Sequence, residues 1–323
     1  LSMKKNKFLF CIGLLLTVAT IVNAQSVTWI SSTEGNVWQK SKVKLQSKSE
    51  QNPVLQVDGT ENGVAFKNWG TTFNELCWDA LGLLTRTEQD EILYNIFSPQ
   101  GDLRITRGRI SMGANDYARS WYSCDEVEGD FELRYFNINR DKQTIIPFIR
   151  AAQKYNPNLT FWISPWCPPS WMKINGDYPV LSSPFNSLSE KQNYLLYGAT
   201  GGQVDENEMK LTGARDGVFP RQLATTDFMI QDPRYLQTYA DYFCRFIDAY
   251  KEQGIPIDMV MYQNEAYSYT PYPGCAWTAT GTIRFNKEYL APTLRQMHPE
   301  VKLYLGTFNT NRQDHVETIL EIG

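Results

Sequence analysis

The chain has 323 residues and a formal net charge of −4 at pH 7, which allows a large hydrophobic core and gives no sign of a nucleic-acid partner. Only two histidines are present, His298 and His315, so we do not expect a Ser-His-Asp triad or a histidine-rich metal site. No feature of the sequence requires a metal or organic cofactor, and none is expected. Carboxylates are the expected proton carriers. Aromatic residues make up 13% of the chain, a level usual for proteins that stack sugar rings, although an aromatic core is the commoner explanation.

Residues 1–24 have the pattern of a secretory signal peptide. A basic stretch after Met3 precedes an apolar run from Phe8 to Val22, and small residues end at Ala24. This run is shorter than the roughly 20 residues that a transmembrane helix needs, and no cysteine follows Ala24 to accept a bacterial lipid anchor. We therefore expect cleavage after Ala24 and a secreted or periplasmic protein without an integral membrane segment.

The cysteines beyond the expected cleavage site are odd in number and lack Cys-x-x-Cys spacing, which argues against a zinc site and against a fully paired disulfide framework. Free buried thiols are the default prediction. A single bridge between Cys77 and Cys124 stays open as an alternative. The five residues are Cys77, Cys124, Cys167, Cys244 and Cys275.

Apolar and polar residues alternate within residues 25–60, and this pattern predicts short antiparallel strands of a side β-sandwich outside the main domain. Residues 61–323 change to units of a strand followed by a helix. Strands are expected at 64–70, 103–113, 159–164, 257–263 and 301–306. Thr87 and Asp141 are expected to open the first two helices, the second of which stops at Pro157.

The helix that Asp232 opens has the strongest signals, since Pro233 occupies its first turn and Gly254 ends it. Its expected buried stripe consists of Tyr235, Tyr239, Tyr242, Phe243, Phe246 and Tyr250. The long segment between Trp171 and Asp232 is either one wall of a site or a surface insertion.

Alternation of strands and helices is typical of a parallel α/β fold. A closed (β/α)8 TIM barrel needs eight such units, and about five are recognisable in this chain. We therefore predict an incomplete TIM barrel over residues 61–323. Because the fifth strand would leave an open sheet edge, residues 25–323 alone are expected to be insoluble or inactive.

Asn264 and Glu265 end the fourth expected strand. In an α/β barrel the carboxyl ends of the strands carry the chemistry. A carboxylic acid at that place can protonate a glycosidic oxygen, while the neighbouring carboxamide holds the 2-hydroxyl of the sugar. For the isolated dipeptide, an ordinary surface glutamate after a strand is the alternative.

Several segments together resemble glycoside hydrolase family 30, which includes glucosylceramidases and β-1,6-glucanases. The most specific of these segments is SPWCPPSWMK at 164–173. Three others occur in the order that the family has: WGTTFNE at 69–75, RGRISMG at 107–113 followed by NDY at 115–117, and Asn264-Glu265. The similarity runs from about residue 27 to 320. The chain departs from the family in having Ala266 where proline is usual, and Thr-Thr in place of a Gly-Gly run in the first loop.

The resemblance implies a role for each matched residue. Glu265 would be the general acid/base, and Asn264 would bind the 2-hydroxyl of the sugar. Trp166 would wall the sugar site, Asp116 would bind distal hydroxyls, and Arg109 would anchor the catalytic carboxylates. A buried ion pair of Arg109 with Asp116 and a core role for Trp166 stay open as alternatives.

Other residues near these motifs have no assigned role. Glu75 is a further carboxylate beside the site, without a place in the family pattern. Four aromatic residues are candidates to extend a sugar-binding platform, with core or lid packing as the alternative for each: Trp171, Tyr267, Tyr272 and Trp277.

The family takes its nucleophilic glutamate from the seventh strand, so no residue of this chain is assigned to that role. We predict an exported retaining β-glycosidase that hydrolyses β-glucosidic bonds in an oligo- or polysaccharide, with β-1,6-glucan favoured over glucosylceramide. A non-catalytic glycan-binding barrel is the alternative of another class. A β-xylosidase, β-fucosidase or β-1,6-galactanase is the alternative within the family.

Overall fold

The computed structural model describes residues 26–44, 63, 66–188, 227–266, 268, 270–308 and 313–322. The expected signal peptide at 1–24 and the middle of the long segment, 189–226, lie outside these residues. The chain divides into two units, Leu1–Ala65 and Phe66–Gly323. Within the described part of the chain, no helix is long and apolar enough to cross a membrane.

The described part of the first unit is an antiparallel hairpin. Strand β1 (Ser26–Thr33) pairs with β2 (Asn36–Lys44), and Gly35 in the turn has φ +77°, a conformation that favours glycine. Trp29 and Val37 are mostly exposed. The hairpin agrees with the antiparallel strands expected for this region.

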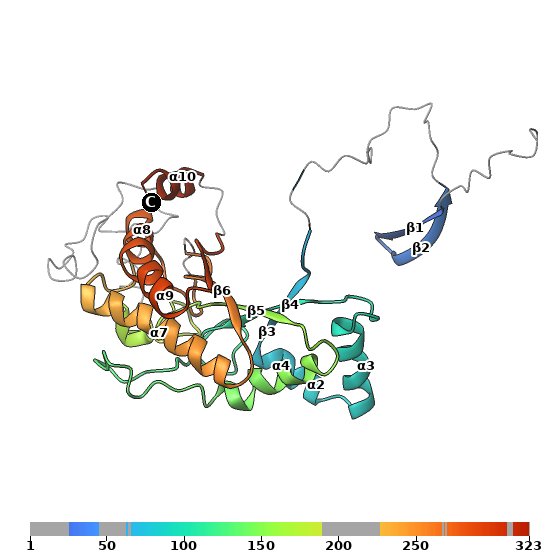
Figure 1. Ribbon diagram of the computed structural model, residues 1–323, viewed down its shortest axis with the longest axis horizontal. Helices are drawn as coiled ribbons and strands as arrows, with labels where there is room; N and C mark the ends of the chain where they lie inside the picture. Colours follow the sequence, from blue (N-terminus) through green and yellow to red (C-terminus); the bar gives the residue numbers. More distant parts are fainter. Residues whose placement is uncertain are drawn as a thin grey trace, which may run out of the picture. The chain divides into compact units, whose positions relative to one another are not determined.

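The second unit is built on a parallel sheet whose five strands follow the chain order β3-β4-β5-β6-β7 (Figure 1). Consecutive parallel strands that lie side by side are the arrangement of a TIM barrel. The strands are β3 (Gly70–Phe73), β4 (Arg107–Ser111), β5 (Thr160–Ser164), β6 (Ile257–Met261) and β7 (Lys302–Tyr304).

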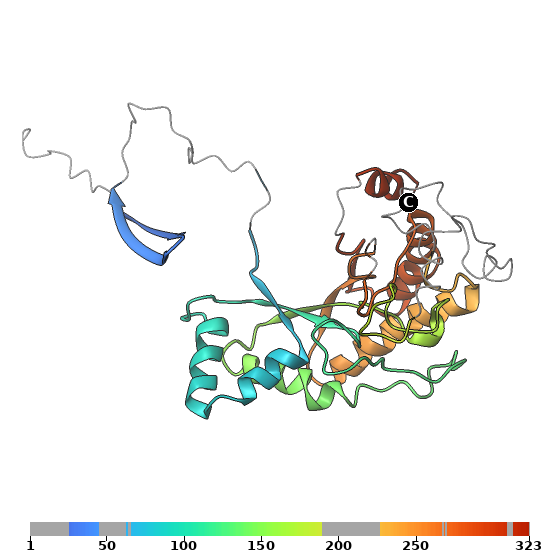
Figure 2. The ribbon, with the colours of Figure 1, turned by 180° about the vertical axis from the view of Figure 1, so that it is seen from behind.

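Helices connect the strands of this sheet. Helices α2, α3, α4 and α7 lie along one side of it in both views (Figures 1 and 2). The helical segments are α2 (Glu75–Gly82), α3 (Arg86–Phe97), η1 (Asp141–Gln143), α4 (Ile145–Gln153), η2 (Ser170–Met172), α7 (Pro233–Glu252), α8 (Ala279–Arg284), η4 (Phe285–Leu290), α9 (Ala291–Met297) and α10 (Gln313–Ile322).

Helix α7 confirms its sequence prediction. The carboxylate of Asp232 accepts a hydrogen bond from the Arg234 backbone N–H, Pro233 is the first helical residue, and Gly254 follows the helix with φ +74°. The aromatic stripe of the helix is buried as expected, apart from the half-buried Tyr235.

Three element boundaries differ from the expectations. The first strand begins at Gly70, because residues 70–73 are the ones that pair with β4, while Phe66 is 70% exposed. Residues 103–105 are not a strand. Helix α3 is capped by Thr85, since this hydroxyl accepts from the Glu88 backbone N–H and the Glu88 carboxylate accepts from the Thr85 backbone N–H.

The helix expected to open at Asp141 begins there only as a single 3₁₀ turn. Helix α4 proper runs from Ile145 to Gln153 and ends before Pro157. Asp141 is fully buried and accepts hydrogen bonds from the hydroxyls of Tyr122 at 2.6 Å and Tyr250 at 2.7 Å. Its side chain thus anchors the turn instead of capping the helix.

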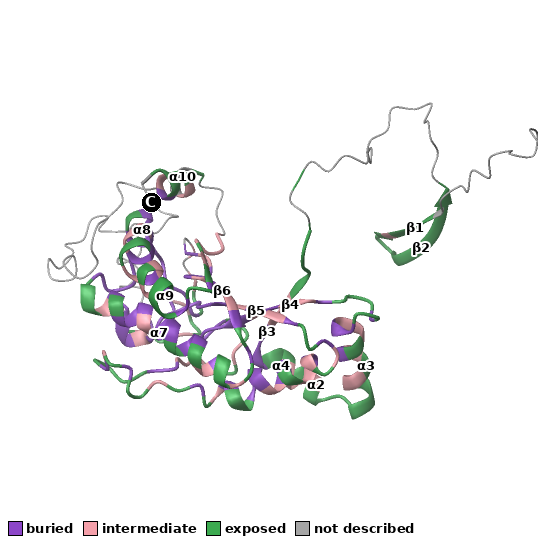
Figure 3. Ribbon diagram, in the orientation of Figure 1, coloured by how far each residue is buried: buried purple, intermediate pink, exposed green. Residues whose placement is uncertain are grey.

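Close packing fixes β4 between its neighbours. A Cβ atom added at Gly108 would lie 2.5 Å from the ring of Phe73 and 2.8 Å from that of Phe161, so these strands approach as they do because residue 108 has no side chain. Buried residues gather on the strands and on the sides of the helices that pack against them (Figure 3). Many of the aromatic residues are core residues, among them Tyr239 and Phe285, whose rings stack 5.3 Å apart.

All five cysteines beyond the expected cleavage site are free thiols, and four of them are buried as the default prediction had it. The alternative bridge between Cys77 and Cys124 is wrong, because Cys77 is exposed on α2 whereas Cys124 is buried under Tyr242, whose hydroxyl accepts its backbone N–H. Among the described residues, no group of histidine, cysteine and carboxylate side chains is arranged to hold a metal ion.

Candidate active site

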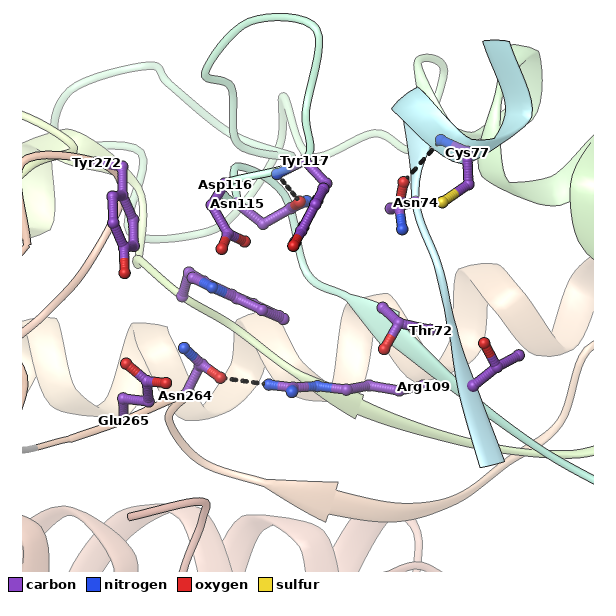
Figure 4. Close-up of a pocket in the computed structure, with 12 residues that line it drawn as sticks. Thr72, Asn74, Cys77, Arg109, Asn115, Asp116, Tyr117, Asn264, Glu265 and Tyr272 are labelled. Atoms are coloured by element: carbon purple, nitrogen blue, oxygen red, sulfur yellow. Dashed lines mark hydrogen bonds between the residues drawn. The ribbon is translucent and has the colours of Figure 1, made fainter. Parts of the chain in front are cut away.

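A cavity of about 520 Å³ opens at the carboxyl ends of the parallel strands (Figure 4). The structure brings all five of the predicted site residues into its wall: Arg109, Asp116, Trp166, Asn264 and Glu265. The remaining lining residues are Thr71, Thr72, Asn74, Cys77, Asn115, Tyr117 and Tyr272. Segments from the ends of β3, β4, β5 and β6 therefore meet in one pocket, as expected for a TIM-barrel site.

Arg109 holds the floor of the cavity together. Its Nη2 donates to Asn264 Oδ1 at 2.6 Å, and its Nε and Nη2 donate to Ser164 Oγ at 3.1 and 2.8 Å. The guanidinium carbon lies 4.1 Å from the centroid of the Trp166 ring, a cation–π contact that orients the indole. These hydrogen bonds of Arg109 thus go to a hydroxyl and an amide, not to the carboxylates that it was predicted to anchor by charge-assisted bonds. Asp116 and Glu265 act on its guanidinium by charge alone.

Burial lowers the pKa of Arg109 to about 10, and the charges of Asp116 and Glu265 oppose this change. The guanidinium therefore remains protonated at neutral pH. The pKa of Asp116 changes in the opposite direction. Burial raises its pKa, and the nearby Glu265 raises it further, against the attraction of Arg109. The negative charge of Glu265 thus disfavours the ionisation of Asp116 in the same cavity.

Backbone contacts with neighbouring strand ends fix Asn264 and Glu265. The Asn264 N–H donates to the Pro165 carbonyl at 2.8 Å, and the Glu265 N–H donates to Thr307 Oγ1 at 3.2 Å. Glu265 has φ +49°, a left-handed conformation that costs a residue with a Cβ about 1 kcal/mol. The surrounding contacts maintain this strained turn, and it directs the carboxylate into the cavity (Figure 4).

Gln263 is a positioning residue that the sequence did not single out. Its fully buried Nε2 donates to the carbonyls of Trp166 at 2.7 Å and Asn264 at 2.8 Å, and its Oε1 accepts from Trp277 Nε1 at 3.2 Å. One amide therefore links the ends of β5 and β6. The available signal was a carboxamide at the end of an apolar strand, which requires partners when it is buried.

Asp116 stands in a turn that its neighbours organise. Asn115 Oδ1 accepts from the Tyr117 backbone N–H at 2.8 Å, and Asn115 Nδ2 donates to the Gly113 carbonyl at 3.1 Å. Gly113 has φ +81°. This turn of asparagine and glycine places Asp116 and Tyr117 at the rim of the cavity.

Glu75 is not part of the cavity wall. Its carboxylate is fully buried and accepts hydrogen bonds from Arg140 Nε at 2.9 Å, Arg140 Nη2 at 2.6 Å and the Arg119 backbone N–H at 2.8 Å. This carboxylate therefore joins α2 to the loops after β4. The carboxylate left without a role in the sequence has a structural one.

The four candidate platform aromatics separate into different classes. Trp171 is buried and donates to the Asp125 carbonyl at 3.1 Å, and Trp277 is fully buried. Tyr272 lines the cavity. Tyr267 lies outside the described residues. Of these candidates, Tyr272 is therefore the residue that the structure brings to the site.

Comparison with known proteins shows which family the chain resembles. Residues 66–183 match the family model described as glycosyl hydrolase family 30 TIM-barrel domain. The resemblance to glycoside hydrolase family 30 is confirmed. Putative glucosylceramidase 3 of Caenorhabditis elegans is 27% identical over 294 residues, which cover 86% of this chain and 47% of that relative. Endo-1,6-beta-D-glucanase neg1 of Aspergillus fumigatus is 24% identical over 278 residues, which cover 84% and 50%. The chain thus spans about half the length of these relatives.

Solved structures agree on the fold. SrfJ from Salmonella typhimurium aligns with a TM-score of 0.61 at 18% identity, over 87% of this chain and 53% of that one. The endo-beta1,6-glucanase BT3312 aligns with a TM-score of 0.58 at 21% identity, over 82% and 50%. The prediction of a partial family 30 TIM barrel is therefore confirmed.

Proposed function

We propose that the full-length protein is an exported retaining β-glycosidase in which Glu265 is the general acid/base. The observation that carries this proposal is the pair Asn264 and Glu265 at the end of β6, directed into a cavity with the Trp166 ring. An acid, an amide and an aromatic face in one pocket suit the hydrolysis of a sugar acetal. The family 30 match of residues 66–183 supports the same class of reaction.

In the proposed mechanism, Glu265 protonates the leaving oxygen while a second carboxylate attacks the anomeric carbon. Glu265 then takes a proton from water, which releases the sugar. Asn264 has a defined orientation for its part. Because Arg109 Nη2 and Thr307 Oγ1 both donate to Asn264 Oδ1, at 2.6 and 3.4 Å, its Nδ2 is the end that donates to the 2-hydroxyl of the sugar.

The second carboxylate of a retaining glycosidase lies about 5–5.5 Å from the first. We assign this role to a later strand of the barrel, following the family resemblance, and assign Asp116 to sugar hydroxyls. Asp116 lies in a turn after β4 and lines the same cavity, where its carboxyl group can accept hydrogen bonds from sugar hydroxyls.

For the substrate we propose a β-1,6-glucan rather than glucosylceramide. Polar side chains suit sugar hydroxyls better than a lipid, and the cavity wall carries several, among them Thr72, Asn74 and Asn115. Both an endo-1,6-beta-D-glucanase and a glucosylceramidase are among the relatives, so homology alone does not choose between them. Export by the signal at 1–24 is tested by sequencing the N-terminus of the mature protein, which should begin at Gln25.

The proposal is tested with the purified full-length protein on a linear β-1,6-glucan, a β-1,3-glucan and glucosylceramide in mixed micelles. We expect reducing ends to be released from the β-1,6-glucan at the highest kcat/KM. Proton NMR during the reaction should show the β-anomer first, as retention requires. Initial formation of the α-anomer contradicts the retaining mechanism, and binding of the glucan without turnover contradicts the enzyme assignment.

A further inference from the structure

Tyr272 stands at the end of the cavity that holds Glu265. Figure 4 shows its hydroxyl directed into the cavity toward Glu265, with Asp116 on the facing side. Burial, and then the charges of Glu265 and Asp116, raise the pKa of this phenol. The residue is 36% exposed, so part of its ring remains open to a ligand.

The segment that carries Tyr272 is fastened to the segment after β5. The carbonyl of Thr270 accepts the backbone N–H groups of both Val180 and Leu181 at 3.0 Å, and the Gly274 N–H donates to the Tyr178 carbonyl at 3.1 Å. Asn186 Nδ2 adds a bond to the Pro271 carbonyl at 3.0 Å. The two segments thus form one hydrogen-bonded unit, which brings Tyr272 to the cavity wall.

Local chemistry restricts Tyr272 further. It lies between Pro271 and Pro273, and proline restricts both its own φ and the conformation of the residue before it. The Tyr272 carbonyl accepts from Thr270 Oγ1 at 2.9 Å, and Pro273 forms an antiparallel bridge with Pro179. The backbone of Tyr272 is therefore held in place before a ligand arrives, so less conformational entropy of this segment is lost on binding.

The position of Tyr272 relative to the reacting bond follows from the role of Glu265. A general acid lies beside the glycosidic oxygen that leaves. The group released with that oxygen therefore lies on the Glu265 side of the bond that breaks. Arg109 and Asn264 hold the opposite side of the bond, where the sugar that is attacked must lie. An open aromatic ring on the Glu265 side therefore faces the leaving group rather than the attacked sugar.

We propose that Tyr272 is the specificity residue for the leaving group, and that its ring stacks on a second sugar and so favours a carbohydrate over a lipid leaving group. The inference rests on the proposed glycosidase function and deepens it. An aromatic face suits the apolar face of a pyranose ring, whereas a lipid chain gains no such flat partner from a single phenol.

The test compares two substrates of the full-length protein. A β-1,6-linked glucose oligosaccharide has a sugar as its leaving group, whereas β-glucosyl fluoride releases only fluoride and leaves the space beside Tyr272 empty. We expect Tyr272→Ala to lower kcat/KM on the oligosaccharide about 10-fold, the loss of one good aromatic contact, and to leave kcat/KM on the fluoride within about 2-fold. Tyr272→Phe keeps the ring and should retain most of the oligosaccharide activity.

Tyr135→Ala is the matched control, since Tyr135 is a 62% exposed tyrosine outside the cavity, and it should leave both substrates unaffected. Equal losses on both substrates in Tyr272→Ala would overturn the inference, because Tyr272 would then act on Glu265 or on the attacked sugar. No loss on either substrate would overturn it as well. If the wild-type protein hydrolyses neither substrate, the proposed function fails, and the inference fails with it.

Discussion

The carboxylate of Glu75 has a structural role and not a catalytic one. It is fully buried and accepts three hydrogen bonds, two from Arg140 and one from the Arg119 backbone N–H. Burial works against its ionisation, yet these donors hold the pKa of Glu75 below its ordinary value of 4.5. We therefore expect Glu75→Gln to weaken the fold and to leave the chemistry of the folded protein intact.

The loss of unfolding free energy in Glu75→Gln depends on how far Arg140 is left without a charged partner. Breaking a fully buried ion pair by removing one member costs about 3–5 kcal/mol, because the other charge is left unpaired. The Arg140 side chain is 29% exposed, so water compensates part of this loss. A decrease of about 2–3 kcal/mol in the free energy of unfolding is the expected result. Urea unfolding of the full-length protein, followed by tryptophan fluorescence, measures it.

The effect also has a defined pH dependence. A carboxyl group whose pKa is lowered in the folded state contributes stability above its unfolded pKa, and this contribution is lost as the pH falls through the folded value. The difference between wild type and Glu75→Gln should therefore be complete at pH 6–7 and shrink below about pH 4.5.

The control is Asp79→Asn, which removes an exposed partner of Arg119 and should change stability little. A Glu75→Gln protein as stable as wild type refutes the structural role. Loss of kcat in a variant that is still fully folded would return Glu75 to the active site.

Three further predictions concern the floor of the cavity and the core. Arg109→Lys keeps the charge but loses the geometry in which Nη2 holds Asn264 while Nε and Nη2 bind Ser164, so kcat/KM on a β-1,6-glucan oligosaccharide should fall about 100-fold; unchanged kcat/KM would contradict the role. Gly108→Ala places a methyl group 2.5 Å from a ring carbon and should cost about 1–3 kcal/mol in urea unfolding, whereas Gly82→Ala, with open space around it, should not. Burial raises the pKa of Asp141 to about 6, so the folded state binds this proton more tightly than the unfolded state does. The free energy of unfolding should therefore fall as the pH rises from about 4 to about 6. Asp141→Asn should remove that fall, and an identical pH profile would disprove its origin.

Local signals allowed the sequence to predict much of this fold. Helix α7 begins and ends where Asp232, Pro233 and Gly254 predict, because each acts on its own stretch of backbone. The cap of α3 shows the limit of such signals. Thr85 and Thr87 are both followed three residues later by a carboxylate, Glu88 or Asp90, and the chain forms the capping box at the first of the two.

The candidate site was predictable to the extent that strand ends determine it. Asn264 and Glu265 reach the cavity because β6 ends just before them, and parallel strands bring their carboxyl ends to one edge. Burial depends on contacts between distant segments, so the sequence did not separate the core residue Trp277 from the cavity residue Tyr272. The hydrogen bonds of Gln263 to Trp166 and Trp277 could not be predicted from the sequence for the same reason.

The central claim is that Glu265 protonates the leaving group, and a series of β-glucosides whose leaving groups differ in pKa tests it most directly. Glu265→Gln in the full-length protein removes the proton donor and keeps the shape of the side chain. We predict that kcat/KM collapses for sugars and other poor leaving groups but stays near the wild-type value for dinitrophenol, which departs without protonation. A variant that hydrolyses the whole series as the wild type does would contradict the account.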